Sequence, residues 1–210
     1  MRVNTKQKIM DETICLFNKH GFANVTTSRI AETLGISLGN LTYHFPKKGS
    51  LVEAIYQQLV TELRVLLTNY RQHPDFLSID GQLRGFYKFQ IKYRFFYVDT
   101  LEIGRAFPKI GLQHQAHINM QIQAISATFA FNVDKGNLIN DVPANTYKRV
   151  AHSIWMMTAL WTYQLLIRGK MDTDSENAML ESAWNLIRPY FTEGGQRVYN
   201  ELNHPLSTNA

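Results

Sequence analysis

A short run of mostly polar side chains near the N-terminus has the spacing expected of a helix that contacts nucleic acid. Leu41 and Phe45 lie four residues apart, so a helix over this run would bury one face and expose the other. The outer face would carry groups that donate or accept hydrogen bonds or contact a methyl group, namely Leu38, Gly39, Asn40, Thr42, Tyr43 and His44. A surface of this kind is about the width that the major groove of DNA admits.

A second short helix is expected to hold this surface in place. The helix over residues 28–34 has one apolar stripe, formed by Ile30, Ala31 and Leu34. Thr26 or Thr27 can cap it through a hydroxyl, and Gly35 ends it. Ser37 can cap the next helix, which Pro46 ends. The stretch therefore predicts two helices joined by a tight turn.

The side chains of this stretch suggest separate roles on DNA. Gly39 would let the helix backbone approach the groove, and Asn40 can offer a donor and an acceptor to a base edge. Tyr43 would reach a phosphate, Thr42 would donate one short hydrogen bond, and Leu38 would contact a thymine methyl or no base. The complete predicted interface is Thr26, Thr27, Ser37, Leu38, Gly39, Asn40, Thr42, Tyr43, His44 and Lys48.

Charge is distributed unevenly along the 210 residues. The formal net charge is +5, and residues 1–50 hold seven Lys or Arg against three Asp or Glu. The remaining residues hold fifteen basic against fourteen acidic side chains. A basic N-terminal part is typical of a nucleic-acid-binding module, because neutralising phosphates supplies much of the affinity. A chance fluctuation of a few charges is the alternative interpretation.

Composition narrows the cellular setting. Hydrophobic residues make up 45% of the chain, enough for a substantial core. Cys15 is the single cysteine, which excludes an internal disulfide and a cysteine metal cage and fits a reducing compartment. The first residues lack the apolar core of a signal peptide, and the longest apolar run, near residues 154–167, is interrupted by polar side chains. These features predict a cytoplasmic protein without a membrane segment.

Helical periodicity continues through the whole chain, so an all-α fold is expected. A helix over residues 5–20 would complete a three-helix unit with the two described above. Further helices are predicted near residues 48–72, 78–97, 100–106, 108–133, 145–168 and 174–190, with one more possible turn at 196–202. We predict a helix-turn-helix DNA-binding domain at 1–47, joined by a connector helix to a helical ligand-binding and dimerisation domain at 48–210.

The N-terminal pattern resembles the TetR family of bacterial transcriptional regulators. The matching residues are Phe17, Gly21, Phe22, Thr26, Thr27, Ile30, Ala31, Gly35, Ile36, Ser37, Gly39, Asn40, Leu41, Tyr43, His44, Phe45, Lys48 and Leu51. Thr42 stands where most relatives have Tyr, Gly49 where an acidic residue is common, and Leu38 where a polar or basic residue is frequent. The resemblance implies a homodimer that binds a palindromic operator, usually as a repressor released by a small ligand.

The body of the chain is rich in aromatic residues, which could line a cavity or simply form the core. The candidates for contact with a small apolar or aromatic ligand are Phe89, Tyr93, His117, Met120, Trp155 and Met156. Any single aromatic residue at helical spacing is more often part of the core. A DNA-binding co-regulator or architectural protein, whose body binds a protein or no ligand, is the alternative function.

The last two long predicted helices could pair with a second copy of the chain. One stripe is Trp155, Ala159, Thr162 and Leu166, and the other helix offers Ala178, Ala183 and Trp184. Two such pairs would form a four-helix bundle. Dimerisation would also place two reading helices on DNA, which multiplies the few base contacts of one.

The sequence contains no motif that indicates catalysis, a metal site or a cofactor site. No nucleophile motif, phosphate-binding glycine loop or apolar pair of acids is present. His114 and His117 are three residues apart, but no carboxylate or cysteine accompanies them at a matching interval. We therefore expect no enzyme activity, no metal site and no cofactor.

Overall fold

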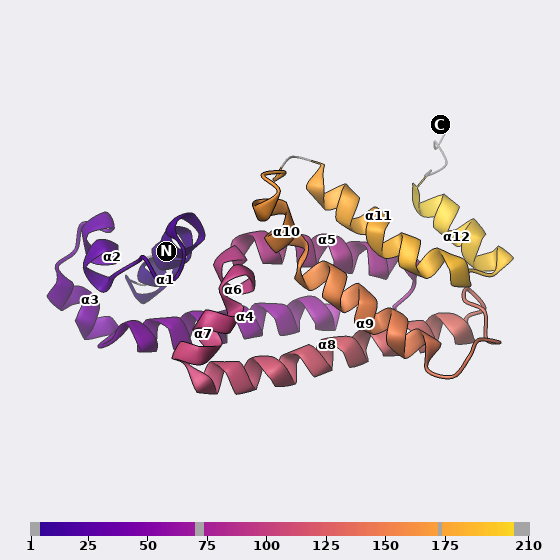
Figure 1. The fold of residues 1–210 in the computed structure, drawn as a ribbon, viewed down its shortest axis with the longest axis horizontal. Coiled ribbons are helices and arrows are strands. Elements are labelled where there is room, and N and C mark those ends of the chain that lie inside the picture. Colours follow the sequence, from indigo (N-terminus) through magenta and orange to yellow (C-terminus); the bar gives the residue numbers. More distant parts are fainter. Residues whose placement is uncertain (1–4, 70–73, 172–173, 204–210) are drawn as a thin grey trace. The chain divides into compact units, whose positions relative to one another are not determined.

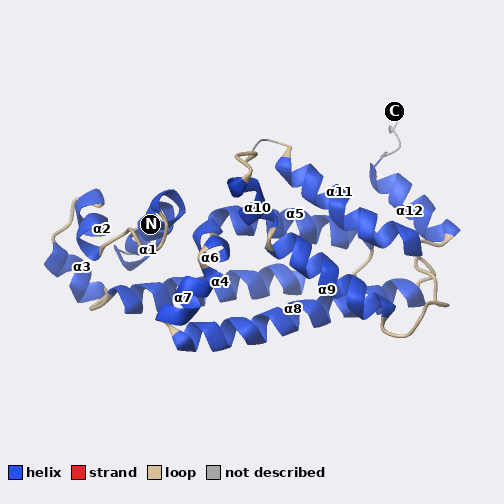
Figure 2. Cartoon of the chain, in the orientation of Figure 1, coloured by secondary structure: helices blue, strands red, loops and turns tan. Residues whose placement is uncertain are grey.

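The computed structural model describes residues 5–69, 74–171 and 174–203, and it confirms the all-α class. These residues form twelve α-helices and a short 3-10 helix, with no strand among them (Figures 1 and 2). The helices are α1 (Thr5–His20), α2 (Thr27–Thr33), α3 (Leu38–His44), α4 (Lys48–Asn69), α5 (Phe76–Lys92), α6 (Arg94–Val98), α7 (Thr100–Ala106), α8 (Pro108–Asp134), α9 (Thr146–Ala159), α10 (Trp161–Ile167), α11 (Ser175–Ile187), η1 (Arg188–Tyr190) and α12 (Glu193–Asn203). No helix among the described residues is long and apolar enough to cross a membrane.

The chain divides into two compact units. The first takes the described residues of Met1–Arg64 and Phe89–Gln115, and the second takes those of Val65–Lys88 and Ala116–Ala210. Helices α4, α5 and α8 each contribute residues to both units. The first unit is thus larger than the predicted domain at residues 1–47, whose boundary stays a prediction.

Helices α1 to α3 form the predicted three-helix arrangement within the first unit. Its apolar centre is formed by the almost fully buried side chains of Ile9, Phe17, Val25, Ile30, Leu41 and Phe45. Gly21 and Gly35 follow α1 and α2 with φ angles of 79° and 64°, a left-handed conformation that costs glycine little. These two glycines let each helix stop and turn within a few residues.

The turn between α1 and α2 is fastened to the other helices of the first unit. The backbone N–H of Phe22 donates to Asp99 Oδ2 at 2.9 Å, from the junction between α6 and α7. The Phe22 ring packs against that of Phe107 with a centroid separation of 6.0 Å. The rings of Phe17 and Phe95 pack with their centroids 5.1 Å apart. The helix-turn-helix therefore shares one core with α6 and α7.

Asn18 bridges the junction between α5 and α6. Its side-chain Nδ2 donates to the carbonyl oxygen of Lys92 at 2.8 Å, and its Oδ1 accepts from the N–H of Phe95 at 2.8 Å. The Arg94 guanidinium also donates to the carbonyl of Asn18 at 2.8 Å. Backbone groups that the interrupted helix leaves without intrahelical partners are satisfied here by α1.

The second unit is centred on a cluster of aromatic side chains. Trp184 of α11 packs against Phe76, Phe191 and Tyr199, with ring centroids 5.0 to 6.2 Å apart. Asp80 of α5 accepts from the indole N–H of Trp184 at 3.3 Å and pairs with Arg84 at 2.8 Å. These contacts tie α5, α11 and the segment leading into α12 together.

Most predicted helices are present, but two are interrupted. The helix expected near residues 78–97 ends at Lys92 and resumes at Arg94, and the one near 145–168 is interrupted at Leu160. The single turn suggested at 196–202 is the longer helix α12. The predicted end of the connector helix near residue 72 lies outside the described residues.

Candidate functional site

Helix α3 presents the predicted polar surface to solvent. Tyr43 is 84% exposed and Leu38 is 45% exposed, whereas Leu41 and Phe45 on the opposite face are buried. Gly39 and Asn40 are exposed as well, and Thr42 and His44 are half-buried. The structure therefore leaves all six predicted residues of this helix exposed or half-buried, around the sides of α3 that are turned away from Leu41.

Hydroxyl caps fix both short helices. Thr26 Oγ1 accepts from the N–H of Arg29 at 3.2 Å, and Ser37 Oγ accepts from the N–H of Asn40 at 3.1 Å. Both caps are extended in the backbone, as N-cap residues usually are. Of the two threonines that could cap α2, Thr26 does so, and Thr27 is the first residue of the helix.

Gly39 has no internal reason to be glycine. A Cβ atom placed there would meet only Ser37 Oγ, at 3.8 Å, which is ordinary contact. Its backbone is helical with a negative φ, so a left-handed conformation is not required either. Any constraint on this position must come from what approaches the outer face of α3.

Thr42 is engaged within its own helix. Its hydroxyl donates to the carbonyl oxygens of Leu38 and Gly39 at 3.0 and 3.1 Å. A hydrogen bond from Thr42 to an external phosphate must therefore replace this internal one. Tyr43 and His44 lie edge to face, with ring centroids 5.2 Å apart, and both rings remain accessible.

Arg29 and His20 form a contact beside the N-terminus of α2. Arg29 Nη2 lies 3.0 Å from His20 Nε2, which can accept only while the imidazole is neutral. Loss of hydration, the charge of Arg29 and the charge of Lys19 together lower the pKa of His20 below its ordinary value of 6.5. The neutral imidazole is thus the form that this contact favours.

Lys48 has an internal partner in the structure. Its ammonium donates to the carbonyl oxygen of Phe22 at 2.7 Å and lies 4.2 Å from the centroid of the Phe22 ring. The same ammonium lies 5.4 Å from the centroid of the Phe17 ring. Partial burial lowers the pKa of Lys48, and Glu102 opposes that effect. The neighbouring Lys47 is exposed.

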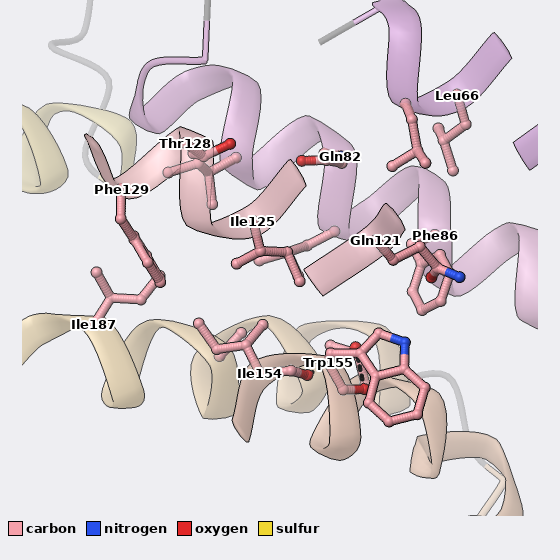
Figure 3. A pocket seen from close by; sticks show the side chains of 15 residues that line it. Leu66, Gln82, Phe86, Gln121, Ile125, Thr128, Phe129, Ile154, Trp155 and Ile187 are labelled. Carbon is pink, nitrogen blue, oxygen red and sulfur yellow. Dashed lines mark hydrogen bonds between the residues drawn. The ribbon is translucent and has the colours of Figure 1, made fainter. Parts of the chain in front are cut away.

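A largely apolar pocket lies within the second unit. Its walls come from α4, α5, α8, α9 and α11 (Figure 3). The lining residues are Leu66, Leu67, Ile79, Gln82, Leu83, Phe86, Gln121, Ile125, Thr128, Phe129, Ile154, Trp155, Thr158, Ala183 and Ile187. In Figure 3, Ile154 and Trp155 of α9 lie opposite Gln82 and Thr128.

Of the six residues predicted to bind a ligand, Trp155 alone lines this pocket. Phe89 and Tyr93 belong to the first unit, where both are buried and their rings pack 5.0 Å apart. Met156 is 44% exposed on the surface of α9. His117 and Met120 are half-buried on α8 without lining the pocket. These five predicted residues therefore do not line the pocket.

Sequence reasoning missed most of the lining because it followed single aromatic residues. A more informative pattern for the pocket is a polar residue within an apolar stripe of a helix. Such residues are Gln82, Gln121, Thr128 and Thr158. Each of these lies three or four residues from another lining residue of its own helix. An apolar stripe with one hydrogen-bonding group is typical of a ligand pocket.

An exposed apolar stripe runs along α9 and α10. Met156, Leu160, Tyr163 and Ile167 recur at helical spacing and are 43 to 73% exposed. Of the predicted pairing stripe, Thr162, Ala183 and Trp184 are at most 3% exposed and pack inside the second unit, so these three side chains are not available on the surface. The unpartnered stripe is the one next to it, and it includes Leu166 from the prediction at its edge.

No cluster of three metal-ligating side chains occurs among the described residues. His114 is occupied by packing, with its ring edge-on to Phe96 at 4.9 Å.

The capped pair of short helices with an outward polar face defines a helix-turn-helix DNA-binding protein. Residues 9–55 match the family described as "Bacterial regulatory proteins, tetR family", and residues 56–199 match its companion described as "Bacterial transcriptional repressor". The chain belongs to the TetR family of transcriptional regulators.

Individual relatives agree with this assignment. A solved TetR-family transcriptional regulator from Marinobacter aquaeolei VT8 is 26% identical, covers 94% of this chain and 97% of its own, and superposes with a TM-score of 0.85. The HTH-type transcriptional repressor AcnR of Corynebacterium efficiens is 26% identical over 67% of this chain and 72% of that protein. The probable HTH-type transcriptional regulator YttP of Bacillus subtilis is 33% identical, but the match spans only 28% of either chain.

Proposed function

We propose that this protein is a dimeric transcriptional repressor that reads a palindromic operator through α3 and responds to a small ligand. One observation carries the DNA-reading part. The exposed face of α3 is held by buried Leu41 and Phe45 and by the Ser37 cap, so its side chains have a defined orientation. The operator lies in the cytoplasm of a bacterial cell, which is where we place the protein.

Within this proposal, the residues of α3 have distinct roles. Asn40 pairs with a base edge, while Tyr43, His44 and the hydroxyls of Thr26 and Thr27 contact phosphates. Leu38 lies against a thymine methyl. Lys48, predicted from sequence to contact a phosphate, instead supports the turn before α2 through its bond to Phe22.

Selection of bound sequences from random DNA tests the proposal. We expect a palindrome with half-sites separated by about one helical turn. Tyr43→Ala should weaken binding to all sequences alike, whereas Asn40→Ala should relax preference at one base position. The proposal fails if no sequence is enriched, and the division of roles fails if the two variants behave in the opposite way.

The apolar stripe on α9 and α10 supports dimerisation. A row of large apolar side chains in water is unfavourable, and a second copy of the same stripe would cover it symmetrically. One reading helix alone makes too few base contacts to specify a site, so the proposed function needs the pair.

Sedimentation of stripe variants tests this surface. Leu160→Glu places a charge in the stripe and should convert the dimer to a monomer that no longer prefers palindromes. Leu77→Glu is the matched control, because Leu77 is a comparably exposed leucine of α5 outside the stripe. Loss of the dimer in both variants, or in neither, would contradict this interface.

The largely apolar pocket supports a response to a ligand over the alternative of an architectural DNA-binding protein. A ligand changes DNA affinity only if it binds the DNA-competent and released conformations differently.

Transcription from a promoter carrying the selected site should fall when the protein is present. Increased transcription would make the protein an activator instead.

A further inference from the structure

The pocket of the second unit contains hydrogen-bonding groups but no charge. Among the described residues that line it, none is Asp, Glu, Lys, Arg or His. A carboxylate or ammonium group in such surroundings would lose its hydration without gaining an opposite charge, which is a large penalty. The lining therefore selects against ionised molecules.

Charged residues nearby are already paired with one another. Asp80 and Arg84 lie two residues to either side of Gln82 on α5. Arg84 Nε donates to Asp80 Oδ2 at 2.8 Å, and its Nη1 donates to Glu176 Oε1 at 3.3 Å. Asp80 and Arg84, which flank Gln82, are thus paired and do not line the pocket, and Gln82 is the polar group that α5 contributes to its lining.

The other polar groups of the pocket are committed to their own helices. The Thr158 hydroxyl donates to Ile154 O at 2.8 Å, and the Thr128 hydroxyl donates to Ala124 O at 3.2 Å. Gln121 Nε2 donates to His117 O at 3.4 Å. These groups keep acceptor capacity but have directed their donors at backbone carbonyls.

Gln82 differs from these groups. Its side-chain amide makes no hydrogen bond with any residue that the structure describes, although it is half-buried in the pocket wall. Figure 3 shows the Gln82 side chain between those of α8 and the end of α4, across from Trp155. Both a donor and an acceptor are thus available at one point of an otherwise apolar lining.

We propose, on the ligand-binding role inferred above for this pocket, that its occupant is an uncharged, largely apolar molecule with a carbonyl or hydroxyl oxygen that the Gln82 amide holds. The apolar part would contact Ile125, Phe129, Ile154 and the indole of Trp155. A carbonyl would accept from Nε2 of Gln82, and a hydroxyl would donate to its Oε1. One neutral hydrogen bond of this kind changes affinity about three- to tenfold.

Three one-ring probes of almost the same shape test the proposal on the full chain. Acetophenone carries a carbonyl, isopropylbenzene carries neither charge nor oxygen, and benzoate carries a charge. The concentration dependence of thermal unfolding gives each dissociation constant. Acetophenone should bind about three- to tenfold more tightly than isopropylbenzene, and benzoate should bind roughly a hundredfold more weakly than acetophenone.

Substitution of the amide separates its role from that of the apolar walls. Gln82→Met keeps the size of the side chain and should make acetophenone and isopropylbenzene bind equally. The matched control is Gln123→Met, an exposed glutamine of α8 that does not line the pocket, and it should keep the difference. Circular dichroism verifies the fold, and the comparison of probes on the unaltered chain needs no variant.

The outcomes distinguish this inference from the proposed function. Tightest binding of benzoate, or a carbonyl preference that survives Gln82→Met, would overturn the inference while leaving the pocket a ligand site. Absence of binding by all three probes would overturn the inference and the ligand response together. The DNA selection experiment is independent of either result.

Discussion

The packing of the protein does not explain why residue 39 is glycine. Because a Cβ atom fits there without a clash, Gly39→Ala should fold normally and gain up to about 1 kcal/mol of helix stability. The added methyl would nevertheless hold the backbone of α3 away from the groove, so operator affinity should fall about tenfold or more. Paired urea denaturation and DNA-binding measurements check both effects.

A structural role for Gly39 would appear differently in the same pair of measurements. Loss of stability together with loss of affinity would show that the glycine serves the fold. Ser28→Ala, at an exposed position of α2 outside the predicted interface, is a control for the effect of a small substitution.

His20 should make stability depend on pH. Its folded-state pKa is lowered, so between that value and 6.5 the unfolded chain binds more protons than the folded chain. The free energy of unfolding should therefore decrease as pH falls through the range around and below 6.5, because loss of hydration and the charges of Arg29 and Lys19 disfavour the protonated imidazole. Well above pH 6.5, where the imidazole is neutral in both states, this histidine has no effect on the slope.

Urea denaturation at a series of pH values measures this contribution. His20→Gln keeps a hydrogen-bonding side chain but cannot titrate, so the decrease between about pH 7 and pH 5 should be smaller than in the unaltered chain. The other histidines are common to both proteins and cancel in the comparison. Identical pH profiles would exclude His20 as the cause.

At the scale of helices, Asn18 satisfies backbone groups where α5 ends and α6 begins. Asn18→Ala removes the partners of the Lys92 carbonyl and the Phe95 N–H, so unfolding free energy should drop by about 1–3 kcal/mol. Asn24→Ala is the matched control, because its side chain makes one exposed hydrogen bond to His20 O. Its effect should stay near 0.5 kcal/mol or below.

A distinction between Asn18 and a simple surface residue comes from hydrogen exchange. The amide of Phe95 should exchange faster in Asn18→Ala, since water replaces its partner. Unchanged exchange at Phe95 and unchanged stability would show that the α5–α6 junction holds without α1.

The helix boundaries show what local sequence determines. Gly35 and Pro46 stop helices by their own backbone chemistry, and the Ser37 cap needs only its neighbours, so α2 and α3 were predicted closely. The interruption at Tyr93 has no glycine or proline. Its backbone groups pair with Asn18, which is 75 residues earlier than Tyr93 in the chain, and local periodicity cannot reveal such a partner.

The candidate sites divide in the same way. The α3 surface belongs to one short helix, and the spacing of Leu41 and Phe45 is enough to predict that Leu38 and Tyr43 lie in solvent. The pocket needs five helices, and Lys48 turns inward because Phe22 lies beside it. Three-dimensional neighbours decide these features, and the sequence pattern does not contain them.

At the scale of the whole molecule, the basic N-terminal part should make DNA binding sensitive to salt. The logarithm of affinity should fall linearly with the logarithm of salt concentration, with a slope of about −0.9 for each phosphate neutralised. Lys47 is an exposed lysine that follows α3, and we expect its ammonium to neutralise one phosphate. Lys47→Met should therefore lower the magnitude of the slope of a dimer by about 2.

Lys48→Met is the informative partner of that experiment. Because its ammonium is bonded to Phe22 O, we expect a loss of about 1–3 kcal/mol in stability with an almost unchanged salt slope. A slope reduced as much as in Lys47→Met would restore Lys48 to the phosphate contacts predicted from sequence.

The single cysteine allows one distance to be measured between the two chains of the proposed dimer. Cys15 is exposed on α1, within the same unit as α3, and the sequence contains no other thiol. A spin label attached there would mark each reading unit once without any mutation. Electron paramagnetic resonance would then give one distance per dimer, and its change on addition of DNA or acetophenone would show how far the two halves of the reader move.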